Sequence, residues 1–225
     1  MIKITESTVF NVGADCIVNT INCVGFMGRG IALEFALRYP DLEKQYIEQC
    51  HKKQIHTGHV YFYEIDEQKI INFPTKFHFK YPSQMEWIEQ GLQDFIKNYK
   101  RWNIKSIAFP LLGANNGGLD PKEVETIMVK YLSQVEIDVF ICHSKLLEGK
   151  ELEMVNAFNT TPVEEMKKHV RLNSKQFTAL LNNQNKIKRF IDISKIEGIG
   201  IDTYRGLFTL FYNNKNIVGE QLTLF

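Results

Sequence analysis

The sequence predicts a layered α/β domain followed by a small appendage that is part helical and part β. Strand-like and helix-like segments alternate as far as residue 143, which is typical of a sheet covered by helices. Two strand-like segments run directly into glycine-rich stretches that open a helix, a common place for a ligand loop in α/β sheets. Beyond residue 150 the alternation stops. We therefore place the α/β domain at residues 1–150 and a separate region at 151–225.

The individual elements follow from local patterns. Short apolar runs indicate strands at 2–4, 15–21, 59–64, 69–73, 105–110 and 136–142. Longer stretches between them indicate helices at 30–38, 41–53, 84–101 and 121–133. Residues 162–193 are also expected to be helical, and the glycine-punctuated tail from 196 onward is expected to be β-like.

The composition is that of an ordinary globular protein, with 44% hydrophobic and 24% charged residues. No apolar run approaches the ~20 residues of a membrane span, and the N-terminus lacks the apolar core of a signal peptide. The cysteines show no C-x-x-C spacing, so neither a zinc site nor a disulfide framework is indicated. They are Cys16, Cys23, Cys50 and Cys142. We expect a cytoplasmic protein that needs no metal ion or cofactor.

The first chemical signal is the stretch DCIVNTINCVGFMGRGIALEF at residues 15–35. A buried strand leads to Gly25, Gly28 and Gly30, and a helix opens at once, so bare backbone and unpaired N–H groups suit a phosphate or diphosphate. The stretch is not a P-loop, because no Gly-Lys-Ser/Thr follows, and its G-x-x-G-x-G spacing fits a Rossmann fingerprint poorly. A glycine-rich turn without a ligand is the alternative.

The second signal is IAFPLLGANNGGLDPKEV at residues 107–124, where a buried strand again opens into a glycine loop and a helix. Asp120 precedes Pro121 and stands three residues before Glu123, a pattern that predicts an N-cap in a capping box. Two such loops at the carboxyl ends of strands can enclose a diphosphate from both sides.

The third signal is a lysine in IINFPTKFHFKYPS at residues 70–83. Pro74 is expected to stop the strand, and Lys76 follows two residues later among Phe73, Phe77 and Phe79. Partial desolvation should lower the pKa of this ammonium, and a neutral amine is a nucleophile. The alternative is a lysine whose stem merely covers aromatic surface.

Together these three motifs resemble the macrodomain family, and more narrowly its DarG branch. The matching runs are D-x-I-V-N-T-x-N-C-V-G-x-M-G-x-G-I-A, F-P-T-K-x-H and L-G-x-x-x-G-G-L-D. The resemblance covers about residues 1–145 and implies a three-layer α/β/α sandwich with a mixed, mostly parallel sheet and an ADP-ribose cleft. It departs from the family at Phe77, where relatives often carry a basic residue, and at Pro121, where they often carry Trp.

The resemblance also implies roles for individual residues. Lys76 would be the catalytic group beside the distal ribose, and Asp120 would help to resolve a lysyl adduct. Asp15 would accept from the adenine amino group and Asn22 would hold the distal ribose hydroxyls. The remaining ligand contacts would be Cys16, Gly28, Arg29, Gly30, Ile31, Gly113, Ala114, Asn115, Asn116, Gly117, Gly118 and Leu119, with Thr75 and His78 contacting the substrate.

The function implied by the DarG branch is removal of ADP-ribose from thymidine bases in DNA, in opposition to a DarT-type toxin. Two alternatives stay open: a module that binds ADP-ribose without cleaving it, and a hydrolase of ADP-ribose linked to protein carboxylates. The sequence also leaves open whether Lys76 attacks as a nucleophile or assists the leaving base.

The C-terminal region carries two further signals. Residues 166–195 contain eight Lys or Arg against one acid, Asp192, and we therefore expect residues 160–205 to contact DNA or an acidic partner, with a solvated helical face as the alternative. The last five residues resemble the peptide that binds the bacterial sliding clamp, with anchors at Gln221, Leu222, Leu224 and Phe225. The alternative is a tail that packs back on its own domain.

Overall fold

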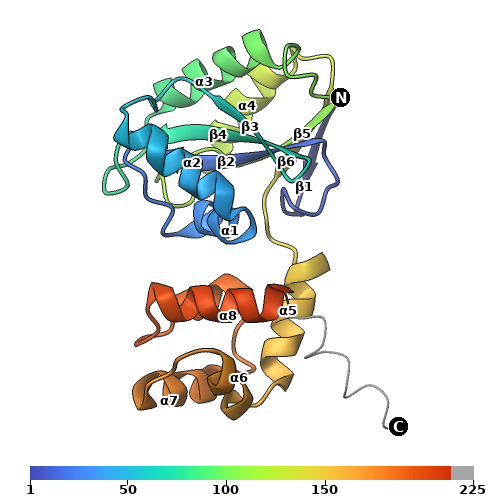
Figure 1. The fold of residues 1–225 in the computed structure, drawn as a ribbon. Helices are drawn as coiled ribbons and strands as arrows, with labels where there is room; N and C mark the ends of the chain where they lie inside the picture. The colour runs from blue at the N-terminus through green and yellow to red at the C-terminus, as the bar shows by residue number, and fades with distance from the viewer. Residues whose placement is uncertain (214–225) are drawn as a thin grey trace. The chain divides into compact units, whose positions relative to one another are not determined.

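The computed structural model describes residues 1–213, which divide into two compact units, Met1–Leu146 and a second unit that begins at Leu147. Figure 1 shows an α/β unit and a helical unit, which are described separately below. Among residues 1–213 no helix combines the length and apolarity needed to cross a membrane.

The first unit is built on one sheet, which in the described residues has six strands in the order β1-β6-β5-β2-β4-β3. The strands are β1 (Ile2–Thr5), β2 (Cys16–Asn22), β3 (Tyr61–Ile65), β4 (Gln68–Lys76), β5 (Ser106–Pro110) and β6 (Asp138–Cys142). All neighbouring pairs are parallel except β3 and β4, which form an antiparallel hairpin. The expected mixed, mostly parallel sheet is confirmed.

Helices cover both faces of this sheet. The helices α1 (Gly30–Arg38) and α2 (Pro40–His51) lie on one face, and α3 (Met85–Asn98) and α4 (Pro121–Leu132) lie on the other (Figure 1). Successive strand residues point to opposite faces, so Ile17 packs in the cluster with Phe35 of α1 while Val18 packs in the cluster with Leu92 of α3. The three-layer α/β/α architecture is confirmed, and burial on both faces explains why the central strands are almost continuously apolar.

One polar pair lies in the middle of this apolar sheet. Asn19 of β2 and Asn72 of β4 stand opposite each other in register, both fully buried. The amide nitrogen of Asn19 donates to the side-chain oxygen of Asn72 at 2.8 Å. A shift of register by one residue would turn one of these amides to the other face and leave both without this bond. The pair therefore specifies how β2 and β4 align.

The expectation that Pro74 ends its strand is wrong, because β4 continues to Lys76. Proline cannot donate to a ladder and is tolerated where one side of a strand has no partner. The pairing with β3 stops at Asn72, so beyond that point only β2 flanks β4. A register irregularity between Ile21 and Asn22 then places Asn22 opposite Lys76 at the end of both strands.

The second unit is helical in its described residues. It contains α5 (Gly149–Thr160), α6 (Val163–His169), α7 (Ser174–Asn183), the 3₁₀ helix η1 (Phe190–Lys195) and α8 (Ile201–Asn213). The sequence did not predict α5, and the β-like tail expected from residue 196 is wrong for α8. Although α8 is rich in aromatic and β-branched residues, Tyr204, Leu207, Phe208 and Phe211 recur at helical spacing and are buried. Tertiary packing against Phe190 decides the conformation.

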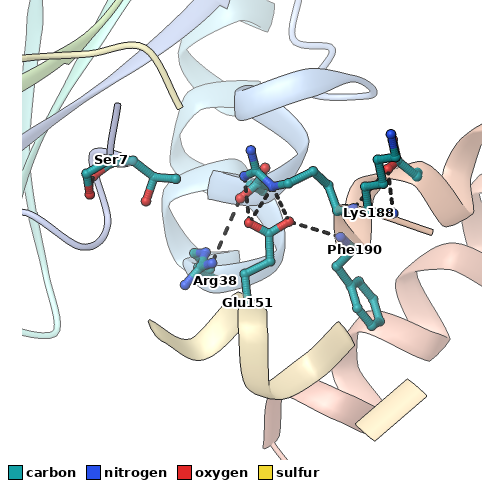
Figure 2. A network of polar contacts seen from close by, with 9 residues as sticks. Ser7, Arg38, Glu151, Lys188 and Phe190 are labelled. Atoms are coloured by element: carbon teal, nitrogen blue, oxygen red, sulfur yellow. Dashed lines mark hydrogen bonds and ion pairs between the residues drawn. The ribbon is translucent and has the colours of Figure 1, made fainter. Parts of the chain in front are cut away.

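A buried carboxylate ties η1 to α5. Glu151 is 6% exposed, and its oxygens accept from the Arg189 side chain at 2.9 Å and from the backbone N–H of Phe190 at 2.9 Å (Figure 2). Because a buried charge is costly without a partner, the guanidinium of Arg189 and the N–H of Phe190 together make the burial of Glu151 possible.

We expect Arg189→Ala to lower the free energy of unfolding by about 3 kcal/mol, the lower part of the range for broken buried ion pairs, because the Glu151 charge would stay buried. Urea denaturation of the full chain measures this change. Lys188→Ala is the matched control, since Lys188 is exposed and only its backbone N–H is bonded, to Asp192 at 3.2 Å. Equal stability of both variants would show that the pair contributes nothing.

Candidate functional site

The three sequence motifs meet at one edge of the sheet. The parallel strands β2, β4 and β5 all end there, and each leads into one of the loops singled out above. Backbone hydrogen bonds join the loops: Cys23 N donates to Phe77 O at 3.1 Å, and Ser83 N donates to Gly117 O at 2.9 Å. The edge is therefore one connected surface made of three loops.

The first loop is held in shape by Asn22. Its side-chain oxygen accepts from Val24 N at 2.9 Å and from the Tyr46 hydroxyl at 3.0 Å, and its amide nitrogen donates to Phe26 O at 2.7 Å. Asn22 is 6% exposed. The side-chain oxygen and nitrogen of Asn22 are therefore both bonded within this part of the protein, while its contact with the distal ribose stays a prediction.

The loop then opens α1 without a capping side chain. Arg29 occupies the N-cap position, and among the described residues its side chain makes no cap hydrogen bond to the first N–H groups of α1, at Gly30 and Ile31, which the helix itself also cannot pair. Gly30 has a φ of +57°, and a β-carbon placed on it would lie 2.5 Å from the side-chain nitrogen of Asn116. The two glycine loops thus touch at Gly30, beside a helix N-terminus that is free for an anion.

The second loop requires glycine for steric reasons. A β-carbon on Gly117 would lie 2.0 Å from the carbonyl oxygen of Gly113 and 2.4 Å from the hydroxyl of Ser83. The hydroxyl of Ser83 is buried and has no hydrogen-bond partner among the described residues. Ser83 was not predicted, because nothing in its local sequence shows that it lies under this loop. In the same loop Ala114 is buried, Asn115 and Gly118 are exposed, and Leu119 packs against the core.

Asp120 caps α4, as the sequence predicted, but among the described residues the Glu123 side chain does not return the second bond of the predicted capping box. Its Oδ1 accepts from Lys122 N at 2.9 Å and from Glu123 N at 3.0 Å. The N-terminal amides of α4 are therefore already paired with a carboxylate, in contrast to those of α1. The two loops offer different surfaces to an anion, and the helix N-terminus that remains open is that of α1.

Lys76 is the last residue of β4, and its ammonium donates to the backbone oxygen of Asn116 in the second loop. Partial burial lowers the pKa of the Lys76 ammonium, in the expected direction. The aromatic surroundings differ from expectation, since Phe73 is fully buried in the core while Phe77 and Phe79 are 60% and 41% exposed. Lys76 is thus half-enclosed, between the end of its strand and the second glycine loop.

Asp15 and Cys16 do not join these residues. They lie where β2 begins, and a strand of seven residues at ~3.3 Å per residue separates them from Asn22 by roughly 20 Å. The Asp15 carboxylate accepts from Lys69 Nζ at 3.1 Å and from Lys105 N at 2.9 Å. Cys16 is fully buried, which raises the pKa of its thiol. The adenine contact assigned to Asp15 therefore does not fit the structure.

Other residues occupy the carboxyl edge near β1 and β6, where the sequence had suggested none. The segment after β1 contains Glu6, Ser7 and Thr8, and it pairs with the segment after β6 through Ser144 N to Ser7 O at 3.0 Å and Lys145 N to Glu6 O at 2.8 Å. The hydroxyl of Thr8 is buried without a partner among the described residues. The signal that could have found this segment is its position directly after a strand.

The two residues near Lys76 that were predicted to contact the substrate, Thr75 and His78, differ in burial and position. Thr75 is buried within β4, whereas His78 lies in the loop that follows and stacks on Phe79 with a centroid distance of 4.3 Å. Within residues 1–213 no group of three or more His, Cys, Asp or Glu side chains is arranged to hold a metal ion.

The macro domain family model matches residues 18–128, which contain the second and third motifs and the first motif from Val18 onward. A Mycobacterium tuberculosis protein named DNA ADP-ribosyl glycohydrolase is 37% identical over 160 residues, covering 67% of this chain and 46% of the relative. The chain therefore spans less than half the length of this curated relative.

Solved structures agree with this match. The macrodomain of Mycobacterium tuberculosis DarG superposes with a TM-score of 0.62 at 37% identity, covering 63% of this chain and 97% of that one. Thermosipho africanus DarTG, solved in complex with ADP-ribose, gives a TM-score of 0.59 at 30% identity over 65% of this chain and 43% of that one. The chain therefore belongs to the macrodomain family. Within this family, it is of the DarG type.

We expect Gly30→Ala to weaken the binding of ADP-ribose roughly tenfold or more. The added methyl group would displace the Asn116 side chain and block access to the first N–H groups of α1. Isothermal titration calorimetry measures the affinity. Gly13→Ala is the matched control: Gly13 has a similar φ of +66°, but a β-carbon there meets no atom within 4 Å, and it lies two residues before Asp15. An equal loss in both variants would place the ligand elsewhere.

Proposed function

We propose that this protein is a hydrolase that removes ADP-ribose from ADP-ribosylated thymidine in DNA. Its DarG-type macrodomain supports this proposal, as does the name of the Mycobacterium relative, DNA ADP-ribosyl glycohydrolase. The observation that carries it is the position of Lys76, a half-enclosed amine bonded to the second glycine loop at the edge where the first glycine loop opens α1. A module that only binds ADP-ribose does not need an amine with a lowered pKa there.

The arrangement suggests how the ligand lies. The diphosphate binds the open N-terminus of α1 at Gly30 and Ile31, because the N-terminus of α4 is occupied by Asp120. The distal ribose then lies toward Lys76. The adenosine half extends along the carboxyl edge toward Thr8 and the segment after β6, which replaces the role first given to Asp15.

The chemical step uses the free amine of Lys76. The amine attacks the anomeric carbon of the distal ribose, the bond from that carbon to the base breaks, and the electron pair leaves with the base, which takes up the proton that the attacking nitrogen loses. The oxygen of a water molecule then bonds to the anomeric carbon, the bond from that carbon to the lysine nitrogen breaks, and a proton from the water passes to the nitrogen, which releases ADP-ribose and restores the amine. Asp120 assists this second step by accepting a proton from the water, since a carboxylate that accepts two N–H bonds on one oxygen keeps acceptor capacity on the other.

The proposed partners follow from the same relationship. Similarity to Thermosipho DarTG supports a DarT-type toxin as the partner, with the present chain as its cytoplasmic antitoxin. The basic segment 166–195 presents less free charge than its sequence suggests, because three of its cations pair with acids: Lys168 with Glu165, Arg189 with Glu151 and Lys195 with Asp192. The residues proposed to bind the sliding clamp, Gln221, Leu222, Leu224 and Phe225, lie outside the described residues.

We expect Lys76→Ala to abolish release of ADP-ribose from an ADP-ribosylated thymidine oligonucleotide while ADP-ribose still binds within a few-fold of wild type. The diphosphate contacts lie on other residues, so binding and cleavage should separate. Chromatography of released ADP-ribose and calorimetry measure the two quantities. Lys97→Ala, an exposed lysine on α3, is the control. Wild-type turnover of Lys76→Ala, or wild-type protein that cleaves only carboxylate-linked ADP-ribose, would overturn the proposal.

The pH dependence of kcat tests whether Lys76 acts as the neutral amine or as the ammonium. If the neutral amine attacks, kcat rises with pH and levels off above the pKa of Lys76, which lies below the ordinary lysine value of about 10.4. If the ammonium instead protonates the leaving base, kcat falls through the same range. Because burial favours the neutral form of Lys76, we expect kcat to rise with pH. In the Asp120→Asn variant kcat should rise over the same pH range but reach a lower value.

A further inference from the structure

A buried tyrosine of α2 contacts the first glycine loop. Leu42, Tyr46 and Cys50 recur at every fourth residue and form the buried face of α2, so helical spacing turns Tyr46 inward. Its side chain is fully buried. A buried tyrosine needs hydrogen-bond partners for its hydroxyl, and those of Tyr46 lie in residues 22–25, where β2 ends and the loop begins.

The hydroxyl of Tyr46 is bonded to three atoms of this segment. It lies 2.8 Å from Asn22 O and 3.0 Å from Asn22 Oδ1, and it accepts from Gly25 N at 3.2 Å. A hydroxyl has one hydrogen and two lone pairs, so it can share its hydrogen between the two oxygens while it accepts from the backbone. Burial raises the pKa of the Tyr46 hydroxyl above its ordinary value of about 10, so the group stays protonated and remains a donor at neutral pH.

The side chain of Asn22 links Tyr46 to the edge of the sheet that carries Lys76. Asn22 stands opposite Lys76 at the ends of β2 and β4. Its amide nitrogen carries two hydrogens, and within the described part of the chain this nitrogen donates to Phe26 O at 2.7 Å. The second hydrogen matches the distal ribose hydroxyls that Asn22 is expected to hold. A hydroxyl that donates to the amide oxygen also polarises the amide, which strengthens its N–H donors.

Resting on the proposed function, we propose that Tyr46 is a positioning residue for the hydrolysis: through Asn22 it fixes the distal ribose so that the anomeric carbon faces the amine of Lys76. Tyr46 is too deeply buried to touch the substrate itself. The diphosphate lies on other groups, the N–H groups of Gly30 and Ile31, so ligand affinity depends less on Tyr46 than the chemical step does. A displacement of the reacting atoms by about 1 Å can lower a rate roughly a hundredfold.

The test uses Tyr46→Phe, which keeps the buried ring and removes only the hydroxyl. On an oligonucleotide with one ADP-ribosylated thymidine we expect kcat to fall roughly tenfold or more, whereas KM and the affinity for ADP-ribose change by less than about threefold. The midpoint of the pH profile of kcat should stay at its wild-type position, because the surroundings of Lys76 are unchanged. Steady-state kinetics over a series of pH values and calorimetry measure these quantities.

Tyr99→Phe is the matched control. Tyr99 is also buried, but its hydroxyl accepts from Glu136 N at 3.3 Å, beyond the end of α3 and outside the three loops of the site. This variant likewise loses a buried tyrosine hydroxyl, and we expect its kcat to equal that of wild type. A loss of kcat that is specific to Tyr46→Phe therefore reports positioning rather than general destabilisation.

A double variant tests the route through Asn22. Asn22→Ala removes the amide, so adding Tyr46→Phe to it should lower kcat by less than about threefold further. The positioning role is overturned by unchanged kcat in Tyr46→Phe, by a fall in its ADP-ribose affinity as large as that in kcat, by an equal loss in Tyr99→Phe, or by fully additive losses in the double variant. Failure of wild-type protein to release ADP-ribose from the oligonucleotide would instead overturn the proposed function.

Discussion

The hydrogen bond between Asn19 and Asn72 fixes the alignment on which the candidate site depends. This bond, from the Asn19 amide nitrogen to the Asn72 side-chain oxygen, forms in one register of β2 and β4, whereas the Asn19 oxygen and the Asn72 nitrogen are buried without a partner among the described residues. From this register the strand ends follow: Asn22, which shapes the first loop, stands opposite Lys76, which reaches the second. The buried amide pair thus sets the positions of Asn22 and Lys76, a few residues further along the two strands.

The two glycine loops resemble each other in sequence but differ in what they offer a ligand. Both contain glycines required by close contacts, at Gly30 and at Gly117, and both open a helix. The difference lies in one residue, because Asp120 satisfies the N-terminal amides of α4, whereas Arg29 makes no such cap on α1. On electrostatic grounds we therefore expect an anion at the first loop, whereas the second loop accepts the hydrogen bond from Lys76 and carries the carboxylate of Asp120.

The sequence predicted the features that depend on local chemistry. The glycine loops, the N-cap at Asp120 and the alternation of strands and helices all follow from neighbouring residues. The errors arise where contacts with distant parts of the chain determine the local conformation. Pro74 stays within a strand because β3 is short, and α8 is helical because its aromatic face packs against Phe190. The error at Asp15 was avoidable, since a residue that precedes a parallel strand lies at the edge opposite the residues that follow it.

The ring of Phe26 contacts both the first glycine loop and the loop that follows β4. It lies over Gly28 so closely that a β-carbon there would be 2.2 Å from the ring, and it contacts Phe79 on its other side. The ring is itself 49% exposed, so its rotamer decides whether the backbone at Gly28 can be approached from that side. A rotation that uncovers Gly28 would also change the contact with Phe79, so the conformation of the loop after β4 and access to the first glycine loop depend on the same side chain.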